Sequence, residues 1–134
     1  MKRLLFLILI ISTGYFTSCQ KDDPATPEAT SIIDTWKVVE QSPSFGTQNY
    51  YVDISKDTTS TNKVVIDNFF NFGLGHSIKA TQNGLTLTIS NAVLDNHTFN
   101  GTGNISSNTN TITWNFTFDD GNGSENATAT YTRM

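Results

Sequence analysis

Apolar and polar residues alternate along several segments of this chain, and this period constrains the fold more than any other feature. The alternation is clearest at residues 50–55, 85–90 and 111–118, where every second side chain is apolar. A period of two is that of a β-strand with one buried face and one solvated face, which is typical of antiparallel sheets. No window shows helical spacing over three turns, so the pattern predicts an all-β domain.

The alternation and the turn residues between the apolar runs predict about eight strands, at 34–41, 48–55, 63–69, 76–82, 85–90, 97–106, 110–118 and 125–133. Short connections between successive strands favour an antiparallel up-and-down meander. Eight such strands with one dry face can close into a small barrel, which removes exposed edges. We therefore expect a closed or partly open barrel. The same pattern also permits a two-sheet β-sandwich.

The dipeptide Asn83-Gly84 predicts the register of one hairpin. Asn-Gly is the strongest signal for a two-residue type I′ loop, because both central residues need a positive φ. A loop of these two residues gives three apposed pairs on one face: Gln82 with Leu85, Ala80 with Leu87, and Ile78 with Ile89. Apolar residues then lie opposite apolar residues.

The first eighteen residues have the pattern of a secretory signal. Lys2 and Arg3 precede an apolar run at 4–11 that is too short for a bilayer span, which needs about 20 residues. Cys19 is the only cysteine in the chain. A secreted chain with one cysteine cannot form an internal disulfide. We therefore expect this thiol to form a thioether to diacylglycerol.

Residues 1–23 resemble the signal peptide and lipobox of a bacterial lipoprotein. Ser18 is the small residue before the acceptor Cys19, and Phe16 stands where Leu is usual. The stretch Lys21, Asp22, Asp23 is similar to the export signal of Bacteroidota surface lipoproteins. The resemblance implies an acylated N-terminus in the outer membrane, facing the cell exterior. Several acyl chains would make that anchoring stable.

The chain is therefore expected to comprise a signal peptide at 1–18, an acylated N-terminus and flexible linker at 19–31, and a β-domain at 32–134. Two prolines in the stretch 20–31 are typical of a linker. All twelve acidic residues follow residue 18, whereas two of the eight basic residues precede it. The mature chain is acidic and has no basic cluster, which excludes nucleic acid as a partner.

The β-domain resembles a compact lipocalin-like (calycin) barrel. Asp34-Thr35-Trp36 is similar to the Gly-x-Trp signature of that group, with Asp in place of Gly. The resemblance implies that a basic residue on the last strand covers the tryptophan ring, and Arg133 stands at that position. We expect a cation–π contact between Trp36 and Arg133, within about 6 Å.

Residues expected to point inward are mostly aromatic, which favours a filled interior or a shallow cup. Four small residues on the last three strands would leave space beside them: Gly101, Gly103, Ala127 and Ala129. A candidate ligand pocket there would be lined by Phe99, Trp114, Phe116 and Tyr131. The alternative is that the small residues only accommodate their large neighbours.

No catalytic motif is apparent, so we expect a non-enzyme without a cofactor or a metal. His76 and His97 have no ligand-spaced neighbours and are expected at strand ends on the surface. The acidic stretch 119–125 has oxygen ligands at loop spacing, which suits either calcium or a tight hairpin turn. Asp57-Thr58-Thr59 resembles the short O-glycosylation site of Bacteroidota envelope proteins, with Thr58 as the acceptor.

Two functions remain open at this stage. The first is a surface-anchored binding protein that holds a small apolar or glycan ligand at the barrel mouth. The second is a structural or assembly lipoprotein that binds a protein partner in the cell envelope. A cavity above about 300 Å³ would favour the first. A filled barrel with an exposed apolar patch would favour the second.

Overall fold

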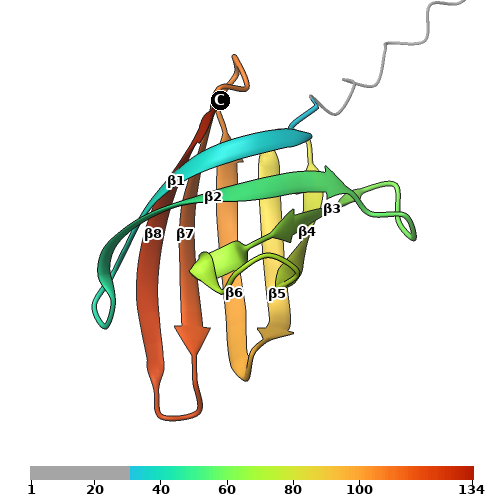
Figure 1. Cartoon of the computed structure of the whole chain (residues 1–134). Helices are drawn as coiled ribbons and strands as arrows, with labels where there is room; N and C mark the ends of the chain where they lie inside the picture. The colour runs from blue at the N-terminus through green and yellow to red at the C-terminus, as the bar shows by residue number, and fades with distance from the viewer. Residues whose placement is uncertain (1–30) are drawn as a thin grey trace, which may run out of the picture.

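The computed structural model describes residues 31–134 (Figure 1). The predictions for the signal peptide, the lipidation site Cys19, the export signal Lys21, Asp22 and Asp23, and most of the linker lie outside the described residues. Within the described part, no helix is long and apolar enough to cross a bilayer.

Eight antiparallel strands form a closed barrel in sequence order. They are β1 (Asp34–Ser42), β2 (Gly46–Lys56), β3 (Lys63–Asp67), β4 (Ser77–Asn83), β5 (Thr86–Leu94), β6 (His97–Ile105), β7 (Thr111–Asp119) and β8 (Ser124–Arg133). In Figure 1, β1 and β2 cross in front of the wall made by β5 to β8. The predicted all-β meander is confirmed, and the barrel, not the sandwich, is its architecture.

Pairing of the first strand with the last closes the barrel. Trp36 on β1 lies opposite Arg133 on β8, and Val38 lies opposite Tyr131. Because side chains alternate across a strand, the inward set on β1 is Trp36, Val38, Glu40 and Ser42, all of which are buried. Closure of this kind leaves no unpaired edge for another chain to extend.

The third strand is shorter than predicted. β3 ends at Asp67, and a 3₁₀ turn, η1 (Phe69–Asn71), follows where the sequence predicted strand to residue 69. Phe69 and Phe70 are adjacent in sequence, yet both are buried. Successive residues of a strand point to opposite faces, so a strand cannot bury both rings inside the barrel. The turn solves this by folding the segment inward.

The predicted register of the β4–β5 hairpin is wrong by two residues. Asn83 pairs with Thr86, so the loop is Gly84-Leu85 and not Asn83-Gly84. Only Gly84 of these loop residues has a positive φ, at 59°. A glycine at the first central position is the requirement of a type II′ loop. The shift keeps the same faces inward, but it leaves Leu85 exposed in the turn.

The fifth strand continues beyond its predicted end at residue 90. It reaches Leu94, which pairs with His97 across a two-residue loop. Both loop residues, Asp95 and Asn96, have positive φ, as a type I′ turn requires. The ladder with β6 contains an irregularity between Ile89 and Ala92. Such a bulge bends the strand, which helps a sheet close into a barrel.

Candidate functional site

The two ends of the barrel are built differently, and two names describe them here. The Trp36 end carries the start of β1, the end of β8 and the loops at 57–62, 84–85 and 106–110. The plug end carries the loops at 43–45, 95–96 and 120–123, together with the 68–76 segment that contains η1. We call this 68–76 segment the plug.

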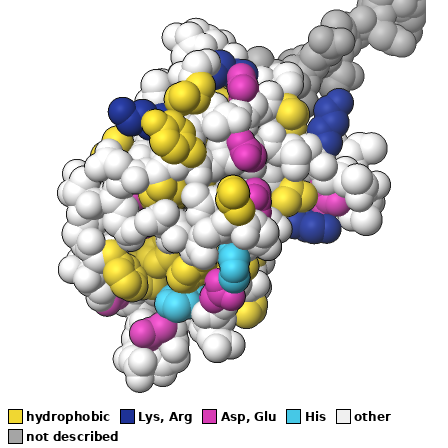
Figure 2. Space-filling model, viewed as in Figure 1, with side chains coloured by type: hydrophobic (Ala, Val, Ile, Leu, Met, Phe, Trp, Pro, Cys, Tyr) yellow, Lys and Arg dark blue, Asp and Glu magenta, His cyan; other side chains and the backbone are white. Residues whose placement is uncertain are grey.

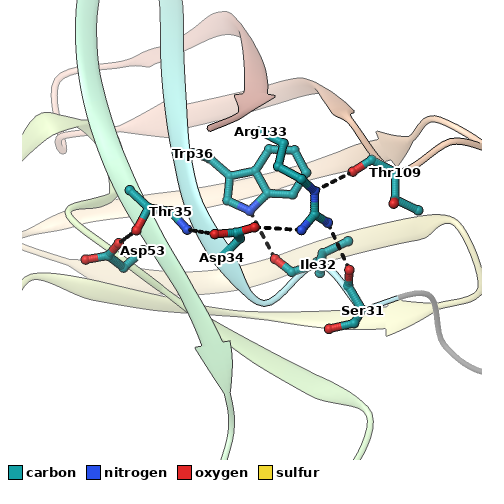
Figure 3. Close-up of polar contacts among 8 residues, drawn as sticks. All are labelled: Ser31, Ile32, Asp34, Thr35, Trp36, Asp53, Thr109 and Arg133. Atoms are coloured by element: carbon teal, nitrogen blue, oxygen red, sulfur yellow. Dashed lines mark hydrogen bonds and ion pairs between the residues drawn. The ribbon is translucent and has the colours of Figure 1, made fainter.

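Trp36 and Arg133 are in contact at the Trp36 end (Figure 3). The Arg133 guanidinium carbon lies 4.7 Å from the Trp36 ring centroid, within the range expected from the sequence. The Trp36 Nε1 donates a hydrogen bond of 3.0 Å to the Ile32 carbonyl. Trp36 is fully buried. Its ring contacts Arg133, and its only polar atom has a hydrogen-bond partner.

Arg133 also ties three chain segments together. Its Nε donates to the Thr109 carbonyl at 2.9 Å, and its Nη2 donates to the Ser31 carbonyl at 2.9 Å. Its Nη1 forms an ion pair of 2.8 Å with Asp34 Oδ2. Asp34, where related signatures carry Gly, therefore has a role in this chain. All three guanidinium nitrogens of Arg133 therefore bond to fixed parts of the fold.

A hollow of about 450 Å³ lies beside this end, against Ile32, the 57–63 segment and Gln82. Its wall includes Asp57, which forms an ion pair with Lys79 at 3.0 Å. Hydrogen bonds from the Thr59 backbone and hydroxyl, followed by Lys79, lower the pKa of Asp57 to about 2. Thr58, the candidate O-glycosylation site, lies between Asp57 and Thr59 and is exposed. Asp57 thus fixes the loop that presents Thr58.

Aromatic rings fill the plug end. Phe69 lies 5.2 Å from Phe99, 5.5 Å from Phe116 and 6.4 Å from Trp114, measured between ring centroids. Phe70 lies 4.6 Å from Phe118 and 5.6 Å from Phe45. Phe45 is 52% exposed and so forms an apolar rim. Figure 2 shows hydrophobic side chains gathered on the face that also carries the two histidines.

The four candidate pocket residues are all part of the core. Phe99, Trp114, Phe116 and Tyr131 are at most 4% exposed, and Phe69 contacts the first three of them. A Cβ on Gly103 would lie 2.8 Å from Trp114 Cδ2, and one on Gly101 would clash with Phe116. The glycines therefore accommodate large rings, as the alternative interpretation held. The structure brings the four residues together, but the plug occupies the space between them.

A buried carboxyl lies among these rings. Glu40 on β1 is 1% exposed, and its Oε2 accepts a hydrogen bond from the Tyr50 hydroxyl. Burial raises the pKa of Glu40 to about 7, and the Tyr50 hydrogen bond opposes that rise. Burial also raises the pKa of Tyr131, with the Glu40 charge as the second cause. The pKa of the Glu40 carboxyl therefore lies near neutral pH.

The Tyr50 hydroxyl also connects this carboxyl to the plug. Burial, Tyr131 and Glu40 all raise the pKa of Tyr50, while a hydrogen bond from the Phe70 backbone lowers it. The hydroxyl therefore lies between the Glu40 carboxyl and the main chain of η1. A second contact holds η1 from β2, because Asn71 Nδ2 donates to Gln48 Oε1 at 3.0 Å.

Two buried polar atoms near this cluster have no hydrogen-bond partner among the described residues: Glu40 Oε1 and Trp114 Nε1. A third such atom, Asp57 Oδ2, is compensated by the Lys79 ion pair. Leaving a buried donor or acceptor unpaired costs about 1–3 kcal/mol, so such atoms are rare in native interiors. The sequence analysis missed Glu40. Its position two residues after Val38, in phase with Trp36, was the available signal.

The two histidines have different surroundings. His76 Nδ1 lies 2.6 Å from Asp95 Oδ2, with both side chains more than 40% exposed, as expected for a surface site. His97 lies at a strand end, as expected, but its side chain is half-buried and not fully exposed. It packs in the plug end, 5.1 Å from Phe72 and 6.1 Å from Phe99 between ring centroids. Its position at the first residue of β6, facing inward, explains the difference.

The acidic stretch 119–125 forms the β7–β8 hairpin. Asp119 Oδ1 accepts from the Gly121 amide at 2.7 Å, and Asp120 Oδ1 accepts from the Asn122 amide at 2.9 Å. Glu125 turns away from the loop and binds the Ser44 amide at 3.1 Å. Across residues 31–134, no three His, Cys, Asp or Glu side chains are grouped so as to hold a metal ion.

Comparison with known proteins relates this chain to other barrels by fold alone. No protein-family profile matches the chain, and no curated protein matches it. Several solved structures are similar to this chain. The redesigned β-barrel b11L5F_LGL has 19% identity over 79% of this chain and 95% of its own, with a TM-score of 0.57.

Two further designed barrels are similar, and both were solved with a small molecule. EF1p2_mFAP2b bound to DFHBI has 19% identity over 79% of this chain and 97% of its own, with a TM-score of 0.58. The redesigned barrel mFAP1 bound to DFHBI has 21% identity over 78% and 98%, with a TM-score of 0.57. The class of protein is thus an eight-stranded, closed antiparallel barrel.

Proposed function

We propose that this chain is a non-catalytic binding protein of the cell envelope, whose plug end holds a small apolar ligand. The observation that carries the binding role is the aromatic plug end, where Phe45 forms an exposed rim against the Phe70 and Phe118 rings. Ligand pockets are mostly apolar and aromatic, with a few polar groups. The two designed barrels solved with DFHBI support the idea that a barrel of this class can hold a small molecule.

An apolar ligand fits this end better than a glycan. A glycan presents many hydroxyl groups, and each one that enters the barrel needs a hydrogen-bond partner. The plug end presents rings of Phe45, Phe72 and Phe118 instead, with His97 as the polar neighbour. Flat aromatic surfaces would gain from edge-to-face and offset packing with these rings.

The anchor in this proposal rests on the sequence. Lipidation of Cys19 would hold the chain in the outer membrane, and Lys21, Asp22 and Asp23 would direct it to the cell exterior. The test is fractionation of cells that express the Cys19→Ala variant, which should leave the membrane fraction. Replacing the three export residues with alanines should keep acylation but hide the domain from external protease. Pelleting of Cys19→Ala with carbonate-washed outer membranes would overturn the anchor.

The absence of catalysis is also a proposal. The buried carboxyl Glu40 has a tyrosine as its hydrogen-bond partner, and His76 pairs with Asp95 on the surface. His97 Nδ1 contacts the Asp95 carbonyl. Within residues 31–134, neither histidine is therefore hydrogen-bonded to a serine or threonine hydroxyl, as a general base for acyl transfer would be.

Ligand binding is tested by titrating the ¹⁵N-labelled chain with naphthalene, a flat apolar probe. We expect saturable shifts of amide signals at Phe69, Phe70 and Phe118, and no change at Trp36. The Trp36 end serves as the internal control, because its contacts are fixed by Arg133. If naphthalene gives no saturable change, or shifts both ends equally, the binding role is wrong.

A protein-binding role is the second candidate, and one observation favours it. The interior is filled, and apolar side chains are exposed beside the plug end, with Phe45 at 52%, Leu74 at 78% and Val93 at 71%. Phe45→Ser should then abolish contact with an envelope protein while leaving the barrel folded. A saturable naphthalene response at Phe69 and Phe70 would favour the small ligand.

A further inference from the structure

The two unpaired polar atoms lie on the same row of the barrel. Glu40 on β1 is directly opposite Ala129 on β8, and Ala129 is directly opposite Trp114 on β7. All three side chains point inward and are buried. Neighbouring strands are about 4.8 Å apart, so the Cα atoms of Glu40 and Trp114 are roughly 10 Å apart. Between them, Ala129 presents only a methyl group.

The unpaired atoms have complementary chemistry. Trp114 Nε1–H is a donor only, while an ionised Glu40 Oε1 is an acceptor only. A hydroxyl group is both donor and acceptor, so one hydroxyl can satisfy both atoms at once. A carboxylate would be repelled by Glu40. An ammonium group has no lone pair to accept from Trp114.

The plug places an apolar side chain next to this row, and its backbone is strained. Asn68, Phe70 and Asn71 have φ values of 59°, 58° and 59°. The left-handed conformation is unfavourable for a bulky residue such as Phe. Strain of this kind persists only where the surroundings enforce it, and it gathers at functional segments. The Phe69 ring, 6.4 Å from Trp114 and 0% exposed, is thus held over the row by a strained turn.

We propose that Phe69 and Phe70 occupy the space that the rings of a ligand take when it binds. The ligand is a flat aromatic molecule carrying one hydroxyl group. The hydroxyl donates to Glu40 Oε1 and accepts from Trp114 Nε1–H, while the rings replace the plug. This inference rests on the proposed function and adds the ligand class and its two anchoring residues.

The test compares three probes on the full wild-type chain at pH 8: naphthalene, 2-naphthol and 2-methoxynaphthalene. 2-Naphthol supplies both hydrogen bonds, whereas 2-methoxynaphthalene accepts from Trp114 but has no proton to donate to Glu40. A hydrogen bond to a charged group contributes enough for about a tenfold change in affinity. We therefore expect 2-naphthol to bind about tenfold more tightly than either of the others.

A second readout does not depend on any variant. The chain has two tryptophans, so its two indole N–H signals are separable. The Trp114 signal should move downfield with 2-naphthol more than with naphthalene, because it gains an acceptor. The Trp36 signal should stay fixed, because its Nε1 already donates to Ile32.

Two variants complete the experiment. Glu40→Gln keeps an acceptor for Tyr50 but turns the unpaired oxygen into a donor, and Trp114→Phe removes the indole N–H. Each should bring the affinity for 2-naphthol close to that for naphthalene. Trp36→Phe is the matched control, since it removes an N–H at the other end, and it should keep the tenfold difference.

The outcomes separate this inference from the function on which it rests. Equal affinity of the wild-type chain for naphthalene and 2-naphthol overturns the hydroxyl anchor and leaves apolar binding intact. A buried water that bridges the two atoms would give this result. Failure of all three probes to bind overturns the proposed function together with this inference.

Discussion

The two ends of the barrel are closed by opposite means. At the Trp36 end, one arginine makes a ring contact, an ion pair and hydrogen bonds to two carbonyls, and every partner is a fixed part of the fold. At the plug end, closure comes from phenylalanine rings carried by a strained turn, above two polar atoms without partners. At the first end, the Trp36 indole N–H and the Arg133 guanidinium both have hydrogen-bond partners. At the second end, Glu40 Oε1 and Trp114 Nε1 have none among the described residues.

That difference suggests a division of roles within one small barrel. Hydrogen bonds and the ion pair fix the register in which β1 and β8 meet, whereas burial of apolar rings depends mainly on area, so these contacts can be exchanged for those of another molecule. We therefore expect changes at the Trp36 end to lower stability. Changes at the plug end should alter the response to pH and to ligands.

The largest expected effect is that of Trp36→Ala. This change removes a fully buried indole and its ring contact with Arg133, and large aromatic truncations in cores cost about 3–5 kcal/mol. Urea denaturation followed by circular dichroism measures the loss as a lower midpoint. A loss below about 1 kcal/mol would mean that this end does not hold the barrel closed.

The pH dependence of stability tests the plug end. Burial raises the pKa of Glu40 from its usual 4.5 to about 7, so the folded state keeps a proton that the unfolded state has lost. Stability is therefore greatest below about pH 4.5 and falls as the pH rises to 7. At about 1.36 kcal/mol per pKa unit, the fall is roughly 3 kcal/mol.

Urea titrations at intervals from pH 5 to 8 measure this slope, and Glu40→Gln is the control. The variant should lose most of the slope, because it has no proton to release. Asp57, with its pKa near 2, titrates below this window. Parallel slopes for wild type and variant would assign the pH dependence to other groups.

Arg133→Ala should have a smaller effect than Trp36→Ala. The cation–π contact contributes about 0.5–2 kcal/mol, and the ion pair with the part-exposed Asp34 contributes less. Arg133→Lys separates the contribution of the charge from that of the hydrogen bonds. Lysine keeps the charge but loses the forked geometry that reaches both Ser31 and Thr109. If the lysine variant is as stable as wild type, the fork is unimportant.

The smallest expected effect is a difference in stability between two variants of Phe70. Phe70 has a φ of 58°, which glycine adopts without strain and alanine does not. Phe70→Gly should thus be more stable than Phe70→Ala by about 1 kcal/mol. Phe99 on β6 is the control, since alanine should be the more stable replacement in a strand. The same order at both positions would argue against strain in the plug.

The sequence was most informative where side chains follow a simple period. Alternation predicted the eight strands, and the resemblance to lipocalin-like barrels predicted that Trp36 and Arg133 meet at closure. It was less informative at turns, because a glycine's position within a loop sets the register. Both Asn83-Gly84 and Gly84-Leu85 keep the same apolar faces inward, so the pattern alone could not separate them.

The candidate site was predicted only in part. Phe99, Trp114, Phe116 and Tyr131 are neighbours inside the barrel, as alternation implied, but the plug between them was not foreseen. It depends on backbone angles at Asn68, Phe70 and Asn71 that no periodic pattern encodes. Glu40 was overlooked because charged residues are seldom buried, although its spacing from Trp36 placed it inside.

Amide hydrogen exchange, with and without saturating naphthalene, tests most directly whether the plug gives way to a ligand. The Phe72 amide donates to Phe69 within η1, and the Ile105 amide donates to Leu85 at the Trp36 end. Because binding stabilises the folded barrel while displacing the plug, we expect exchange to slow at Ile105 and to quicken at Phe72. Slower exchange at both amides, or no change at Phe72, would contradict this account.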